Sequence, residues 1–424
     1  MLQALIILFS VYTAIKVYVS VMQMGYIIDE KRKDAVLMTK AKYQEAARYA
    51  VEKEKVDLTA HLVEYLLFIW WALAGFGMLY NFISPYVGES SFVASIIFLI
   101  GYFTIDYIVS FPLSIYQTFV VDKEFGFTKS TPKLFIVDQI KSIILFLTIG
   151  IGVMALLIWI IESFELWWMY GFVTIMAILL IINFAYPTII APMFNKFTPL
   201  DDKELQNKIE VLMENAGMKA DGVFVMDASK RDNRLNAYFG GFGKSKRVVL
   251  FDTLLAKLSH DELIAVLGHE LGHYKHGDIW KNIALMTILF FGVFYLLGHL
   301  PESIFAELRT APIAGAKIAF IMLVFPLIAF IWMPIISLFS RHNEYQADEY
   351  GSGVGGKEHL VSALIKLVGE NKAFPKSHPL YIFFYYSHPP ILERLKVLGF
   401  DESHYKDNSS LSHDGIFSFT KNEQ

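Results

Sequence analysis

Long apolar runs separated by polar stretches dominate the pattern of this 424-residue chain. A helix that spans a bilayer needs about 20 consecutive, mostly apolar residues. Seven runs fit that template: Leu2–Met24, Tyr65–Ile83, Phe92–Val120, Ser142–Ile161, Trp167–Tyr186, Ile283–Leu300 and Ile318–Ser340. The first lacks a basic start and a small-residue cleavage site, which predicts a retained helix rather than a signal peptide. We therefore predict a mainly α-helical, polytopic membrane protein with seven transmembrane helices.

The composition agrees with this pattern. Hydrophobic residues make up 55% of the chain and charged residues 18%, with a mean hydropathy of +0.44. A soluble domain has about 25% charged residues, so most of the apolar surface is expected to face lipid. The net charge of −4 gives no indication of a nucleic-acid partner. The chain has no cysteine, which excludes disulfides, cysteine-ligated zinc and thiol catalysis.

Basic residues are distributed unevenly among the loops. Of the 37 Lys and Arg residues, all but Lys16, Arg309 and Lys317 lie in loops on one predicted side of the membrane. Because such residues are retained on the cytoplasmic side, we predict an outside N-terminus and an inside C-terminus. The chain then divides into membrane helices with loops at 1–193 and 283–340, and cytoplasmic regions at 194–282 and 341–424.

One polar stretch has the spacing of a metal site. Residues 259–262 read S-x-x-E, a capping box, and apolar residues follow at helical spacing. On this predicted helix His269 and His273 share one face, so both imidazoles can reach a single zinc ion. Glu270 beside them is placed to take a proton from a water molecule at the metal. His276 is excluded as a ligand because it lies about 10 Å along the helix from His269. The simpler alternative is two polar residues on an amphipathic helix.

A third protein ligand has to come from elsewhere in the chain. Just past the seventh apolar run, Glu344 and Asp348 are four residues apart and share a helical face. We predict Glu344 as the third ligand of a His₂Glu set. Asp348, one turn further on, is expected to support a ligating histidine or relay protons. From spacing alone, an exposed acidic pair on a juxtamembrane helix is the alternative.

These residues, with others, resemble the Ste24 group of the M48 metallopeptidases, the type I CAAX prenyl proteases. The further segments of similarity are 116–120, 126–128, 190–200, 236–241, 247–255 and 387–390, together with Arg394. The similarity therefore extends over about residues 116–394. The sequence departs from the pattern at Asp278, where many eukaryotic relatives carry histidine; an aspartate is closer to the bacterial heat-shock membrane proteases of the same superfamily.

The resemblance implies a fold and a set of roles. Seven helices would enclose a large water-filled chamber, with a gluzincin-like zinc metalloprotease domain at its cytoplasmic end. One Zn²⁺ would be bound by His269, His273 and Glu344, with Glu270 as the base.

The resemblance also assigns roles outside the zinc ligands. Asp348 would be an acidic active-site residue, and His388 and Arg394 match residues that stabilise the oxyanion and hold the site together. Asn236 matches a residue that hydrogen-bonds the substrate backbone, beside an edge strand around Arg247–Phe251. Taken alone, a histidine next to two prolines is more typical of a turn.

The sequence thus predicts an integral-membrane zinc metalloendopeptidase. Its substrates would be peptides or proteins cleaved near the C-terminus, lipidated (including prenylated) or otherwise delivered by the lipid bilayer. The membrane would be a bacterial inner membrane or the endoplasmic reticulum. Alternatives are a quality-control protease of the heat-shock branch, which is shorter, and a transporter or channel with a structural zinc, although such sites usually have four protein ligands. Asp106 is the first intramembrane charge expected to line the chamber, and a snorkelling or helix-paired carboxylate is the alternative.

Overall fold

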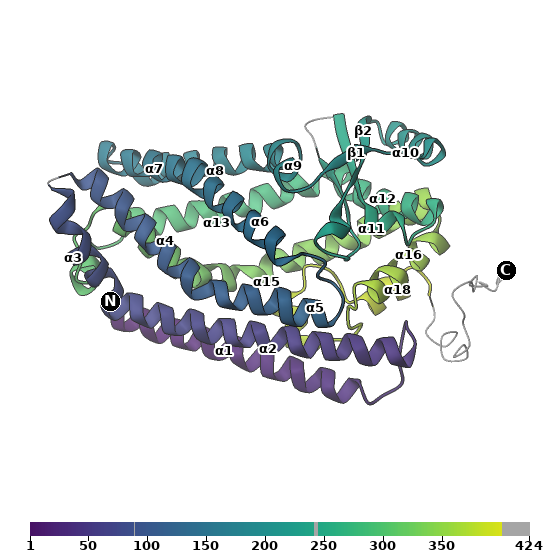
Figure 1. Cartoon of the computed structure of the whole chain (residues 1–424), viewed down its shortest axis with the longest axis horizontal. Coiled ribbons are helices and arrows are strands. Elements are labelled where there is room, and N and C mark those ends of the chain that lie inside the picture. The colour runs from purple at the N-terminus through teal and green to yellow at the C-terminus, as the bar shows by residue number, and fades with distance from the viewer. Residues whose placement is uncertain (89, 241–244, 401–424) are drawn as a thin grey trace.

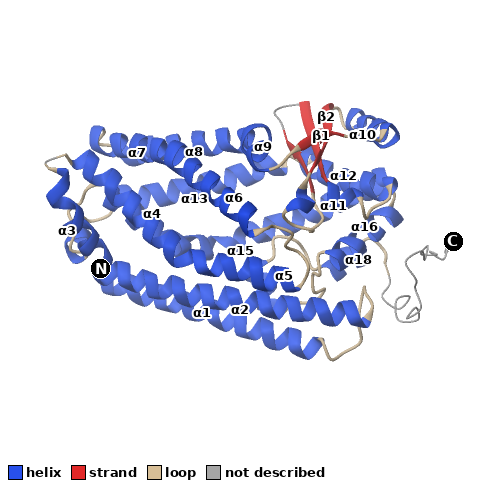
Figure 2. Ribbon diagram, viewed as in Figure 1, coloured by secondary structure: helices blue, strands red, loops and turns tan. Residues whose placement is uncertain are grey.

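The computed structural model of the protein describes residues 1–88, 90–240 and 245–400. Long helices form most of the molecule, and a small β-sheet with shorter helices lies at one end (Figures 1 and 2). The end of the predicted C-terminal region, residues 401–424, lies outside the described part of the chain.

Seven helical spans in the described residues are long and apolar enough to cross a membrane, which confirms the predicted number. They consist of α1 (Leu2–Glu30), α2 (Lys40–Trp70) with α3 (Phe76–Val87), α4 (Ser91–Tyr116) with α5 (Asp122–Glu124), α6 (Pro132–Leu145) with α7 (Ile151–Ser163), α8 (Trp167–Ala185) with α9 (Ala191–Phe194), α13 (Asp278–Gly298) and α15 (Ala314–Gly355). Where two helices form one span, a π-helical turn joins them: Trp71–Gly75, Gln117–Val121, Phe146–Gly150 and Tyr186–Ile190.

Helix α15 is the longest element, with 42 residues, and it runs from one end of the bundle to the other (Figure 1). It contains Pro326 and Pro334, which membrane helices tolerate when neighbouring groups satisfy the freed backbone atoms. The seventh apolar run and the predicted Glu344–Asp348 helix are therefore one unbroken helix. The short helix α14 (Ser303–Glu307) lies in the connection from α13 to α15.

The sheet has four strands in the order β1-β2-β4-β3: β1 (Phe197–Pro199), β2 (Lys219–Met226), β3 (Ala237–Gly240) and β4 (Ser245–Phe251). Strands β2 and β4 are parallel, and the other two pairs are antiparallel. The predicted edge strand around Arg247–Phe251 is therefore wrong, because β4 pairs on both sides. On that side of the sheet the edge strand is β3, which pairs antiparallel with β4.

Further helices surround this sheet at the same end of the molecule (Figure 2). They are α10 (Lys203–Asn215), the 3₁₀ turn Ala228–Lys230, α11 (Asp252–Leu255), α12 (His260–Lys275), α16 (Lys357–Glu370), α17 (Pro379–Tyr385) and α18 (Ile391–Val397). Their core includes Leu250 of β4 and Leu267 and Leu271 of α12, all fully buried. This packing fixes α12 between the sheet and the membrane helices.

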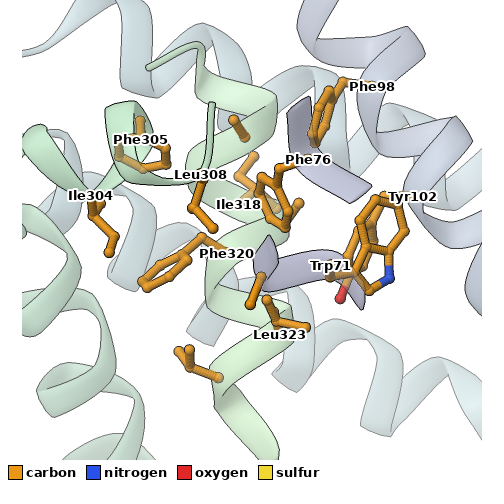
Figure 3. Close-up of a cluster of buried hydrophobic side chains, with 14 of the residues drawn as sticks. Trp71, Phe76, Phe98, Tyr102, Ile304, Phe305, Leu308, Ile318, Phe320 and Leu323 are labelled. Atoms are coloured by element: carbon orange, nitrogen blue, oxygen red, sulfur yellow. The ribbon is translucent and has the colours of Figure 1, made fainter. Parts of the chain in front are cut away.

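A second apolar core closes the opposite end of the bundle. It joins the π-helical turn Trp71–Gly75, α4, α14 and α15 through aromatic side chains that include Trp71, Phe98, Tyr102, Phe305 and Phe320 (Figure 3).

The helices surround an interior chamber whose cavities include one of about 320 Å³ and one of about 670 Å³. Asp106 lines the smaller cavity and accepts a hydrogen bond of 2.9 Å from Nε1 of Trp71. The carboxylate therefore faces the interior, as the sequence predicted.

Candidate active site

The start of α12 is fixed by the predicted capping box. The hydroxyl of Ser259 accepts from the backbone N–H of Glu262, whose carboxylate accepts from the backbone N–H of Ser259 at 2.7 Å. The Glu262 carboxylate also accepts from Ser362 at 2.6 Å and Lys366 at 2.8 Å, both on α16. The buried Glu262 side chain thus fixes the residue at which α12 begins and anchors this helix to α16.

Glycines allow α12 and α15 to approach closely at the site. A Cβ atom on Gly272 would lie 2.8 Å from Cα of Ala347, and one on Gly351 would lie 2.7 Å from the backbone N of His269. Both distances are too short for a side chain, so any larger residue would push the helices apart. The close approach brings the histidines of α12 within reach of the carboxylates of α15.

The three predicted metal ligands meet at this contact. Ligand atoms of His269, His273 and Glu344 all lie within 4.8 Å of one another. Nε2 of His273 is 3.2 Å from Oε1 of Glu344, and Nε2 of His269 is 3.6 Å from Oε2. Zinc bonds of about 2.0–2.1 Å in tetrahedral geometry separate ligand atoms by about 3.3 Å. The observed spacing therefore suits one zinc ion.

Two further carboxylates hold the histidine rings from behind. Oδ1 of Asp348 is 2.9 Å from Nδ1 of His269, and Oδ2 of Asp278 is 2.9 Å from Nδ1 of His273. A carboxylate on the far nitrogen fixes the ring orientation and leaves Nε2 free for the metal. Asp348 thus lies where the sequence predicted support for a histidine. Asp278 is the functional residue that sequence reasoning missed; its place five residues after His273, just past a helix-ending glycine, was the available signal.

Arg394, on α18, lies against the carboxylates of α15 rather than facing open space. It donates two hydrogen bonds to Asp348, at 2.8 Å from Nε and 2.7 Å from Nη2. Its Nη1 is 3.2 Å from Oε2 of Glu344, and the residue is 8% exposed. This two-pronged contact fits the predicted role of holding the site together.

Glu270 and His388 border the ligand cluster. Burial raises the pKa of the Glu270 carboxyl above its ordinary value, and the neighbouring Glu344 carboxylate adds to this effect. His388, whose side chain is 60% exposed, has Nε2 only 3.3 Å from Oε1 of Glu344. Its Nδ1 is 2.9 Å from the hydroxyl of Ser387. His388 is thus the accessible imidazole at the rim of the cluster.

Asn236 lies apart from the ligand cluster, at the start of the edge strand. It is exposed, it precedes Ala237 of β3, and its backbone carbonyl accepts from the N–H of Phe251 at 3.2 Å. Its side-chain oxygen accepts from the N–H of Ala237 at 2.8 Å, which leaves the amide NH₂ on the surface. Phe239 packs β3 against the core that contains α12.

The residues at the cluster fit a bound metal ion. Oε2 of Glu344 is buried and, apart from its ion pair with Nη1 of Arg394 at 3.2 Å, accepts no hydrogen bond within the described part of the chain. Burial lowers the pKa of His273, but Glu344 and Asp278 outweigh it and raise the pKa to about 9. The carboxylates thus create a field that favours a cation here. Two imidazoles and one carboxylate with an open fourth position are typical of catalytic zinc.

The fold and the site together define a class: multi-pass membrane metalloendopeptidases. A family model for peptidase family M48 matches residues 199–399, and a model for the CAAX prenyl protease N-terminal region of five membrane helices matches residues 31–196. This chain belongs to the M48 peptidases, in the CAAX prenyl protease branch.

Individual relatives agree with this assignment. The chain is 34% identical to CAAX prenyl protease 1 homolog of Arabidopsis thaliana, over 85% of this chain and 88% of the relative. It is 38% identical to CAAX prenyl protease 1 of Saccharomyces cerevisiae, over 69% of each chain. The crystal structure of S. mikatae Ste24p matches with a TM-score of 0.85 and 31% identity, covering 94% of this chain and 98% of that one. The family resemblance and the predicted membrane metalloprotease of CAAX type are confirmed.

Proposed function

We propose that this protein hydrolyses a peptide bond near the C-terminus of lipidated or membrane-delivered substrates, using one Zn²⁺ held by His269, His273 and Glu344. The observation that carries the proposal is the meeting of these three residues beside Glu270 at the α12–α15 contact. When bound, zinc supplies Lewis-acid activation of a water molecule and of the scissile carbonyl group. A transporter with a structural zinc is disfavoured, because the cluster leaves a ligand position open next to a carboxylate.

The chain's own residues carry the proton transfers. The Glu270 carboxylate takes a proton from the attacking water and returns it to the leaving amine. Its raised pKa suits both directions, since a base works best when its pKa lies near the working pH. His388 is exposed at the rim and donates a hydrogen bond to the oxygen on which charge develops. Arg394 and Asp348 hold Glu344 and His269 in place.

The substrate is expected to bind as an added strand. Strand β3 pairs on one side only among the described residues, and an extended peptide can hydrogen-bond along such an open edge. The surface amide of Asn236 lies at the start of β3, where it can bond the peptide backbone. A lipid group on the substrate would remain among the membrane helices while the peptide reaches α12. Substrates of this kind, including prenylated ones, match the names of the curated relatives.

The site is proposed to face the cytoplasm of a bacterial inner membrane or the endoplasmic reticulum. Loops at the site's end of the bundle, such as 31–39 and 125–131, contain Lys31, Arg32, Lys33 and Lys129. The opposite loops contain Arg309 and no other Lys or Arg among the described residues between neighbouring helices. Retention of basic loops inside the cell supports this orientation.

The proposal is tested with purified wild type and Glu270→Ala. Each is assayed for zinc content and for cleavage of a C-terminal peptide carrying a farnesylated cysteine, with the unlipidated peptide as a comparison. We expect one zinc per chain in both proteins and cleavage by wild type alone, lost to a chelator and restored by zinc. Wild type that binds zinc and cleaves neither peptide would contradict the proposed function. Glu270→Ala that cleaves at the wild-type rate would remove Glu270 as the base.

A further inference from the structure

The segment 231–236, which leads from the sheet into β3, is held against the membrane helices by arginine. Arg231 donates to both carboxylate oxygens of Asp138 on α6, at 2.8 Å from Nε and 2.9 Å from Nη2. Its Nη1 donates to the side-chain oxygen of Asn195 at 3.2 Å. The Arg231 and Asp138 side chains are only 20% and 18% exposed. A two-pronged pair with this much burial holds a defined geometry.

Arg234 makes a second connection from the same segment. Its Nη2 donates to Asp122 at 2.8 Å and to the hydroxyl of Tyr49, which itself donates to Asp122 at 2.9 Å. The guanidinium lies over the ring of Phe127, 4.2 Å from its centroid. Asp122 is 13% exposed, so this contact is sheltered from solvent. Arg234 therefore ties the segment to α2 and α5 at once.

The backbone reinforces both contacts. The N–H of Lys129 donates to the carbonyl of Arg231 at 3.0 Å, and the N–H of Asn233 donates to the carbonyl of Phe127 at 3.0 Å. Thr128 and Asp232 form an antiparallel bridge between these bonds. Residues 126–129 and 231–233 thus pair as a short ribbon across about a hundred positions of sequence. This ribbon includes residues 126–128, and Asn195 of the segment 190–200 accepts from Arg231, so both segments of family similarity contribute contacts outside the zinc site.

The far end of the segment is fastened to the catalytic side. The N–H of Leu235 donates to the side-chain oxygen of Asn371, after α16, at 2.8 Å, and the amide of Asn371 donates back to the Leu235 carbonyl at 3.3 Å. The next residue is Asn236, and β3 follows. The segment therefore connects the membrane helices directly to the edge strand.

We propose that Arg231 and Arg234 are positioning residues that fix the edge strand β3, and with it the register of a bound peptide, relative to the metal site. The inference rests on the proposed function, because it assumes that the peptide binds along β3. A strand on an edge pairs through its backbone, so a loosened edge permits a shift of two residues that keeps the same side chains facing inward. Such a shift presents a different peptide bond to Glu270.

The experiment compares Arg231→Gln and Arg234→Gln with wild type in the full-length protein. Zinc content is measured first, then kcat/KM for the farnesylated peptide, and then the products by mass spectrometry. A reciprocal exchange, Arg231→Asp with Asp138→Arg, tests the pair itself, and Arg231→Lys serves if the glutamine variant does not fold. The matched control is Arg48→Gln, because Arg48 pairs with Glu124 on the same helices, at 3.7 Å, but does not touch the segment.

We expect both glutamine variants to retain one zinc per chain, to lose roughly tenfold in kcat/KM and to release a second product cut two residues away. The reciprocal exchange should restore much of the rate and the single product, and Arg48→Gln should behave as wild type. Zinc-loaded variants that cut the same single bond at the wild-type rate would overturn the proposal. Failure of the proposed function is distinct, because wild type itself would then release no product.

Discussion

The two ends of α15 bury very different residues. The first end buries small and apolar residues, among them Gly315, Ile318, Phe320 and Leu323. The other end buries Asn343, Glu344 and Asp348. Both ends are tightly packed by glycine: a Cβ on Gly315 would lie 2.4 Å from the backbone oxygen of Ser95, even closer than the 2.8 Å and 2.7 Å contacts of Gly272 and Gly351 at the site. The helix is thus packed closely at both ends.

The difference lies in what the packing achieves. Lipid gives little hydrophobic drive for helices to associate, so the apolar end depends on close contact between side chains and between backbones. At the polar end, buried carboxylates are costly unless cations face them. Arg394 and the two histidines provide part of that balance, and a bound metal would provide the rest. We therefore expect changes at the polar end to alter metal binding and catalysis, and changes at the apolar end to alter stability.

The largest effect is expected for Glu344→Ala. Removing a carboxylate that would contact the metal directly should weaken zinc binding by more than about 100-fold, the upper range for losing an outer partner of a ligand. Peptide cleavage should fall to background. Zinc affinity is measured by competition with a chelator, and Glu349→Ala, an exposed acid on the same helix, is the control. Full zinc occupancy in Glu344→Ala would exclude this residue as a ligand.

Asp278→Asn tests the carboxylate behind His273. An amide is a weaker acceptor for the ring N–H than a carboxylate, so we expect zinc affinity to fall by about 10-fold, within the range for such partners. Asp278 is also the first residue of α13, where an acid favours the helix N-terminus. The Tm of the metal-free protein separates the roles: a lowered Tm with unchanged zinc affinity would make Asp278 a helix-capping residue only.

The origin of this asymmetry was only partly readable from the sequence. The lengths of the apolar runs were sufficient to predict the seven helices, and the spacing of His269 and His273 was sufficient to predict the two histidine ligands on one face of α12. Predicting Glu344 as the third ligand depended both on its four-residue spacing from Asp348 and on the family resemblance. The contact of Asp278 with His273 could not be predicted from the sequence, because backbone geometry decides whether the chain leaving α12 turns its next carboxylate back onto a histidine. That geometry is the left-handed conformation of Gly277, with φ of 70°.

The position of the edge strand is a second feature that the sequence could not predict. The family resemblance implied an edge strand around Arg247–Phe251, but strand order depends on which neighbours pair with it. Strand β3 has only four residues, and its pairing covers the side of β4 that was predicted to be free. Short strands leave little periodicity in a sequence, so the identity of the edge could come only from the folded arrangement.

Phe98→Ala tests the apolar end. The side chain is fully buried and its ring centroid is 5.5 Å from that of Phe76 (Figure 3). We expect a loss of about 2 kcal/mol of stability. The cavity left by the ring is costly, but moving the ring from the protein interior into lipid costs little, because both are apolar. The measurement is Tm in detergent, with Phe82→Ala as the control, since that ring is 71% exposed. Zinc per folded chain should be unchanged; loss of zinc in Phe98→Ala would show that the two ends are coupled.

The smallest effect should come from Glu262, whose charge stabilises the fold of α12 without touching the metal. Burial raises the pKa of its carboxyl, but hydrogen bonds from Lys366, Ser362 and Ser259 outweigh burial and lower it below the ordinary 4.5. A lowered pKa means that the folded form binds the proton less tightly than the unfolded form, so this stabilisation is present above pH 4.5 and is lost as the pH falls further.

Glu262→Gln should therefore lower stability by about 1 kcal/mol at neutral pH, the typical size of a lost helix cap. The Tm difference from wild type should shrink as the pH falls below 4.5, where the wild-type carboxyl becomes protonated and resembles the amide. For Lys366→Gln we also expect a Tm difference that shrinks below pH 4.5, because this change removes the cation that pairs with the Glu262 carboxylate. Since neither change reaches the ligand cluster, zinc affinity should remain at the wild-type value. A Tm difference that stays constant from neutral pH to pH 4 would mean that Glu262 stabilises α12 through the shape of its side chain and not through its charge. Glu262 would then act by packing, as the aromatic residues do at the opposite end of the molecule.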